Sequence, residues 1–189
     1  MKKFLFVITL CFFAINTQGQ SYLEKIENTY QSAPNTASLA KYLNKSKKNL
    51  TKINKSIKSL RRVVIGSNSR SLKKRYSLAI KNNTEYLLNN SLLADKYALR
   101  ITNSLNLDSS QTQKMEYIRE KLYSIKIEAK SLIRTCNFVI NKPRKLTRYK
   151  YNSMSSLNKY LHEAYSELSS RINVLLYVAA TESIERNSN

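Results

Sequence analysis

Apolar residues recur every three or four positions along most of this chain, which predicts amphipathic helices that bury one face. No segment alternates apolar and polar residues strictly by two, as a half-buried strand does. The most regular segment is 109–142, where every step between apolar positions is three or four residues. Its predicted core positions are Met115, Ile118, Leu122, Ile125, Ala129, Leu132, Cys136 and Val139. We therefore expect an all-α fold.

Three further segments carry related patterns. Segment 37–65 alternates steps of four and three, which indicates a heptad seam facing a partner helix, at Leu39, Leu43, Ser46, Leu50, Ile53, Ile57, Leu60 and Val64. Segment 69–105 has a predicted inner face at Leu72, Tyr76, Ala79, Tyr86, Leu93, Tyr97 and Ile101, interrupted by Asn83 and Asn90. Segment 146–185 has one at Met154, Leu157, Leu161, Ala164, Leu168, Ile172, Leu175 and Ala179.

Helix-breaking residues are scarce, so each predicts a boundary. Gly66 suits the left-handed residue after a helix, and Ser69 or Ser71 can cap the next one. Asp108-Ser109-Ser110 predicts a helix start, and Pro143 predicts the end of that helix. Pro34-Asn35-Thr36 predicts the end of a short helix over residues 22–31 and a cap for the following one.

Four long helices joined by short turns favour antiparallel neighbours. We expect an elongated antiparallel four-helix bundle, coiled-coil-like, over residues 36–189, preceded by a short helix and linker over 20–35. A three-stranded bundle with a detached arm is the main alternative.

The first residues resemble a secretory signal peptide. Lys2 and Lys3 precede an apolar stretch over residues 4–15, which is too short to span a bilayer, and Thr17-Gln18-Gly19 fits a cleavage site. We expect a signal peptide over 1–19 and an exported protein, periplasmic or extracellular; an uncleaved anchor is the alternative. Removal of the signal leaves one cysteine, Cys136, so no internal disulfide can form.

Charge is distributed very unevenly. The chain has a formal net charge of +21 at pH 7, and residues 41–84 include fourteen Lys or Arg and no Asp or Glu. In the heptad of segment 37–65, Lys41, Lys48, Lys55 and Arg62 fall opposite the seam. These residues are expected to form an outward basic face.

The predicted topology brings the turns near Gly66 and Pro143 to one end of the bundle and gives it a cationic pole. The expected anion-binding residues of the face and the pole are Lys41, Lys48, Lys55, Lys58, Arg61, Arg62, Arg70, Lys73, Lys74, Arg75, Lys142, Arg144, Lys145, Arg148 and Lys150. Tyr149 and Tyr151 alternate with these cations, and are expected either to stack on a ligand or to pack against Tyr76.

The expected partner is an acidic protein, an anionic glycan or a lipid headgroup. Nucleic acid is possible, although export disfavours it. A purely solvated basic face is the plainer interpretation of such a charge run. The layout alone also resembles two other classes, periplasmic holdase chaperones and helical subunits of a conjugative or type IV secretion apparatus. A secreted effector is a further alternative.

Catalytic chemistry has little support in the sequence. His162 is the only histidine, and the residue three before it is Lys159, so the Glu-x-x-His pair of di-iron bundles is absent. Cys136 lies on a predicted core face, where a thiol usually packs as a small apolar group. The part after the signal has one glycine, Gly66, which excludes a glycine-rich phosphate loop. We expect no enzyme activity, no cofactor and no metal.

Overall fold

The computed structural model describes residues 21–104, 107 and 109–185, with side chains over 35–103, 107 and 109–171. Four long helices pack against each other, and the described residues include no strand. The elements in chain order are α2 (Ser21–Arg62), the π-helical turn η1 (Val63–Ser67), α3 (Arg70–Ser104), α4 (Ser109–Asn141), the 3₁₀ turn η2 (Pro143–Lys145) and α5 (Arg148–Glu185). The predicted all-α four-helix bundle is confirmed. The predicted signal peptide, residues 1–19, lies outside the described residues.

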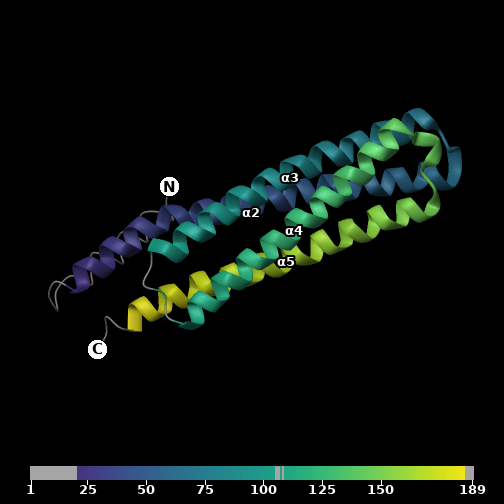
Figure 1. The fold of residues 1–189 in the computed structure, drawn as a ribbon. Coiled ribbons are helices and arrows are strands. Elements are labelled where there is room, and N and C mark those ends of the chain that lie inside the picture. The colour runs from purple at the N-terminus through teal and green to yellow at the C-terminus, as the bar shows by residue number, and fades with distance from the viewer. Residues whose placement is uncertain (1–20, 105–106, 108, 186–189) are drawn as a thin grey trace, which may run out of the picture.

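The helices run alternately up and down the bundle, so the turn after α2 and the turn after α4 lie at the same end (Figure 1). A side-chain contact joins them, because Lys73 Nζ donates to the carbonyl oxygen of Leu146 at 3.5 Å. We call this end, residues 58–75 and 142–150, the pole. The other end holds the start of α2 and the end of α5.

The core positions of α4 are the eight that the spacing predicts. In α2 the predicted seam is buried from Leu39 to Leu60, but the last position differs: Val63 is buried and Val64 only partly so. The regular α-helix ends here, and the π-helical turn η1 begins at Val63.

The predicted inner face of α3 is correct at Ile101 but elsewhere wrong by one position, which is about 100° around the helix. Tyr86 and Leu93 are exposed, and Leu72, Tyr76, Ala79 and Tyr97 are half-buried. The buried face comprises Lys73, Ser77, Ile80, Thr84, Leu87, Ser91, Ala94, Ala98 and Ile101.

Small and hydroxyl-bearing residues explain this shift. Thr84 Oγ1 donates to the carbonyl of Ile80 at 2.7 Å, and Ser91 Oγ donates to that of Leu87 at 2.7 Å. A hydroxyl that donates a hydrogen bond to a carbonyl of its own helix can be buried at a low cost in free energy. Ser77, Thr84, Ser91 and Ala98 recur every seven positions, and such small side chains allow the close approach of α3 to its neighbours.

The turns differ from prediction in one detail. Gly66 lies inside η1 and has no positive φ; the left-handed residue is Asn68, with φ of 49°. Asparagine tolerates this conformation, and the Asn68 amide donates to the Val63 carbonyl at 2.8 Å. Ser69 Oγ accepts from the Leu72 amide at 3.5 Å, which supports the predicted cap, and Pro143 follows the end of α4 as expected.

Pro34 does not break the first helix. The expected short helix and cap are replaced by one continuous helix, α2, from Ser21 to Arg62. Proline removes one backbone hydrogen bond, but its fixed φ is helical, so a helix can continue through it when packing on either side compensates. Leu39 and Leu43, which follow closely, are buried in the core.

The described part of α5 agrees with its predicted face. Met154, Leu161, Ala164 and Leu168 are buried, and Leu157 is half-buried against the core. Ile172, Leu175 and Ala179 lie outside the described side chains. Polar residues that the periodicity did not predict complete the face: Tyr151, Asn158 and Tyr165 are buried, and the Tyr165 hydroxyl shares a hydrogen bond with Ser91.

Candidate anion-binding pole

Acidic residues are absent from the whole pole half of the bundle. This half comprises residues 48–84 and 129–162, which include one end of each of the four helices. It contains nineteen Lys or Arg and no Asp or Glu. The acids lie at its border or beyond, starting with Glu85 on α3, Glu128 on α4 and Glu163 on α5. The molecule is therefore electrically asymmetric along its long axis.

The ion pairs of the described side chains lie outside the pole. The five salt bridges of the described residues use Glu85, Asp95, Glu163 and Glu167. None of the fifteen predicted anion-binding residues pairs with an acid among the described side chains. Thirteen of the fifteen are exposed, and the exceptions are Lys73 and Lys150.

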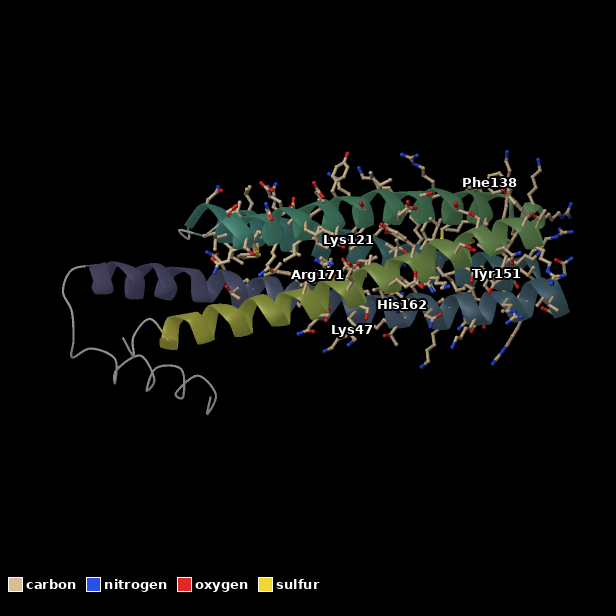
Figure 2. The ribbon with its side chains drawn as sticks, turned by 90° about the horizontal axis from the view of Figure 1, so that it is seen from below. Lys47, Lys121, Phe138, Tyr151, His162 and Arg171 are labelled. Atoms are coloured by element: carbon tan, nitrogen blue, oxygen red, sulfur yellow. The ribbon has the colours of Figure 1, made fainter. Side chains whose placement is uncertain are left out.

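Lys150 is half-buried, and its ammonium group lies over an aromatic ring. Its Nζ lies 3.3 Å from the centroid of the Phe138 ring, a close cation–π contact between α5 and α4. Phe138 lies towards the pole end of α4, and Tyr151 lies near the start of α5 (Figure 2). Lys150 thus contributes to holding α5 against α4 at the pole.

Lys73 differs from the other cations that were predicted to bind an anion, because it is buried. Its side chain is 3% exposed, and Nζ donates to Asn68 Oδ1 and to the Leu146 carbonyl. The ammonium therefore links the turn after α2 to the turn after α4. It serves the fold rather than an external anion.

Helix direction makes the charge at the start of α3 and of α5 costly, whereas Arg61 and Arg62 in the last turn of α2 are favourably placed. Both α3 and α5 begin here, and neither has an acid in its first turn. Arg70 and Lys74 on α3, with Arg148 on α5, place positive charge at the positive end of a helix dipole. The fold gains nothing from cations at these positions.

A cavity opens between the end of α2 and the start of α5. It has a volume of about 210 Å³ and is lined by Arg61, Val64, Ile65, Arg148, Tyr151, Asn152 and Ser155. Two guanidinium groups from different helices flank it, Asn152 and Ser155 add hydrogen-bonding groups, and no acid is present. The sequence placed both arginines at the pole, but their pairing across one cavity depends on the helix register.

A second, more open hollow lies on the other side of α2, where Tyr76 of α3 meets Lys55, Ser56, Lys58, Ser59 and Arg62. The last turns of α2 thus form a ridge with a basic hollow on each side.

Nucleophilic and metal chemistry have no assembled site in the part of the chain that the structure describes. Burial raises the pKa of the Cys136 thiol to about 12, so the thiol stays protonated and unreactive at neutral pH. His162 Nε2 lies 3.2 Å from the Leu50 carbonyl oxygen, a contact between α5 and α2. Across the described residues, no three His, Cys, Asp or Glu side chains are grouped to hold a metal ion.

One ionic cluster away from the pole was not predicted. Glu167 of α5 accepts from Tyr117 Oη, pairs with Lys121 Nζ of α4 at 3.0 Å and with Arg171 at 3.4 Å. The hydrogen bonds from Tyr117 and Lys121 lower the pKa of Glu167, and the bond to Glu167 raises the pKa of Lys121. Lys121 and Arg171 lie further from the pole than Tyr151 does (Figure 2). We call this group the α4–α5 ion cluster.

Comparisons with protein-family models, with curated proteins and with solved structures find no match to this chain. None of the described helices is long and apolar enough to cross a membrane.

Proposed function

We propose that this protein is an exported, non-catalytic helical bundle that binds an anionic or acidic partner through the pole and the outer face of α2. The observation that carries this proposal is the acid-free half: of its exposed cations, Lys159 at the border is the one that pairs with an acid among the described side chains, and the exposed cations of the pole do not. Export rests on the signal-like pattern of residues 1–19.

Energetics support a use for this charge outside the fold. Like charges three or four positions apart on a helix cost about 0.2–0.5 kcal/mol per pair. Lys45, Lys48, Lys52 and Lys55 form a run of such pairs on α2. Cations in the first turns of α3 and α5 add an unfavourable interaction with the helix dipoles. A bound anion relieves both costs, whereas a merely solvated face retains them.

Heparin chromatography tests the proposal with a matched pair of variants. One variant carries Arg62→Gln, Lys74→Gln and Arg144→Gln, which remove three exposed cations from three elements at the pole. The other carries Lys96→Gln, Arg100→Gln and Lys114→Gln, which remove three exposed cations near the opposite end. Both have the same net charge.

The pole variant should elute from heparin at clearly lower salt than the parent, with helicity unchanged. Each lost contact should reduce the slope of log affinity against log salt by roughly 0.7–0.9, so three contacts reduce it by roughly 2–3. The opposite-end variant should elute close to the parent. Equal shifts for the two variants would mean that retention reflects net charge alone, and the proposed function would be wrong.

A further inference from the structure

Two strongly exposed apolar side chains lie at the pole among its cations. Ile65 in η1 is 65% exposed, and Tyr149 in the first turn of α5 is 81% exposed. They come from the two different turns, which the Lys73–Leu146 contact holds together. Single exposed apolar residues are common on proteins, but two at one end of the bundle, in turns that also carry exposed cations, form a mixed surface.

The direction of α3 and α5 presents their first turns outward along the bundle axis. Side chains in a helix tilt towards its N-terminus, and α3 and α5 both begin at the pole (Figure 1). Tyr149, Arg148 and Arg70 therefore lean towards the tip, whereas Ile65, which follows the end of α2, lies beside the cavity that it lines.

The combination of groups favours a lipid surface over a soluble polymer. A glycan would be bound by the cations, but it would leave Ile65 in water. At an anionic bilayer the apolar side chains enter the headgroup region, tyrosine is well suited to that depth, and Lys and Arg are attracted to the lipid phosphates.

The cavity beside Ile65 supplies a place for one headgroup. Arg61 and Arg148 flank it, and Asn152 and Ser155 line it with polar atoms, while Val64 and Tyr151 provide an apolar wall. Guanidinium groups bind phosphate oxygens in a bidentate manner. A phosphate held between these two arginines would also connect α2 to α5.

We propose that the pole docks end-on against a bilayer containing anionic lipids, with Ile65 and Tyr149 in the headgroup layer and a lipid phosphate between Arg61 and Arg148. This inference rests on the proposed function and narrows its anionic partner to a lipid surface. The rest of the bundle then projects away from the membrane.

Tryptophan reporters test the orientation, because the chain has no tryptophan of its own. Tyr149→Trp places the reporter at the tip, and Tyr123→Trp places it on α4 at a site that is 61% exposed. With vesicles of phosphatidylglycerol and phosphatidylcholine, Tyr149→Trp should shift its emission to the blue and lose access to a water-soluble quencher. Tyr123→Trp should change in neither respect, and vesicles of phosphatidylcholine alone should leave both unchanged.

Charge variants test the phosphate cavity. Each cation near an anionic surface is worth roughly a fivefold change in partitioning, so Arg61→Gln with Arg148→Gln should weaken vesicle binding by roughly 25-fold. Lys96→Gln with Lys114→Gln is the control of equal charge. Lys96 lies 26 residues beyond the start of α3, roughly 40 Å from the pole, which exceeds the screening length of about 8 Å. The control should change binding less than twofold.

The possible outcomes separate this inference from the proposed function. Blue shifts of equal size at both reporters would indicate that the bundle lies flat, and would overturn end-on docking. Retention on heparin without vesicle binding would overturn the lipid assignment while the proposed function stands. Loss of pole-dependent binding to both heparin and vesicles would overturn both.

Discussion

Lys73 and Lys74 are adjacent in sequence but differ in environment. Lys73 is buried and its ammonium contacts Asn68 and Leu146, whereas Lys74 is exposed and has no acidic partner. The run of cations in the sequence suggests one role for both residues. The structure assigns Lys73 to the fold and leaves Lys74 available to a ligand.

Alanine at each of these two positions should therefore separate stability from binding. Lys73→Ala removes a buried stem and the link between the two turns, and should lower the free energy of unfolding by about 2 kcal/mol. Lys74→Ala should leave stability within about 0.5 kcal/mol of the parent, since exposed positions tolerate substitution. Urea denaturation measures both values.

Heparin elution at a temperature where both variants are folded provides the second measurement. Lys74→Ala should elute at lower salt than the parent, and Lys73→Ala should elute close to it. If Lys73→Ala instead lost retention while remaining as stable as the parent, its ammonium would have to reach solvent, contrary to the observed burial.

At the residue scale, buried positions could be predicted where the apolar face of a helix contrasts clearly with its polar face. Every core position of α4 was predictable because its apolar residues stand among polar ones at regular steps. Asn158 and Lys73 were not predictable, since a polar side chain gives no sign in the sequence that its partners lie on other elements. The cavity between Arg61 and Arg148 likewise requires the relative register of α2 and α5.

At the scale of the element, α3 shows how a helix pattern can mislead. Its large apolar residues lie on both faces: Tyr86 and Leu93 are exposed, whereas Ile80 and Leu87 are buried. The buried line also includes Ser77, Thr84, Ser91 and Ala98. Large apolar residues alone therefore do not identify the buried face. A helix that approaches its neighbours closely needs small side chains, and a heptad of Ser, Thr and Ala is the signal that identifies the buried face here.

The α4–α5 ion cluster predicts a pH-dependent contribution to helix packing. The pKa of Glu167 is lowered in the folded protein by hydrogen bonds from Tyr117 and Lys121. A lowered folded pKa means that the stabilisation is present above the unfolded value, about 4.3, and is lost as pH falls through the folded pKa. Glu167→Gln should therefore lower the urea midpoint at pH 7, and its difference from the parent should shrink as pH falls below about 4.

Glu163→Gln provides the matched control on the same helix. Among the described side chains, Glu163 pairs with Lys159 alone, at 3.7 Å and four positions earlier, and both side chains are largely exposed. An exposed pair of this kind contributes little, so its removal should barely change the midpoint at pH 7. Equal effects of the two substitutions at pH 7 would show that the cluster does not join α4 to α5.

At the scale of the whole molecule, the antiparallel topology gathers cations that are distant in sequence into one half of the bundle. Residues 48–84 and 129–162 are distant in sequence, but α2, α3, α4 and α5 all contribute to the same acid-free half (Figure 1). The four-helix topology was predictable from the spacing and the turns, and the charge asymmetry followed from it.

This asymmetry implies that the free protein is less stable than its packing allows. Lys48→Glu with Lys55→Glu replaces repulsion by attraction with Lys45, Lys52 and Lys58, which lie three or four positions away on α2. Four pairs change from repulsion to attraction, and each of these two contributions is worth about 0.2–0.5 kcal/mol per pair, so the double variant should gain about 2–4 kcal/mol at low salt, or roughly 4–16 °C in melting temperature. Calorimetry in 10 mM and 1 M salt measures the gain, which should largely vanish at 1 M because exposed charges are screened.

The control variant, Lys48→Gln with Lys55→Gln, should give about half of this gain in stability, since it removes repulsion without adding attraction. A lower melting temperature for the Glu variant at low salt would mean that these lysines make favourable contacts within the fold, and the charge of α2 would then need no external anion.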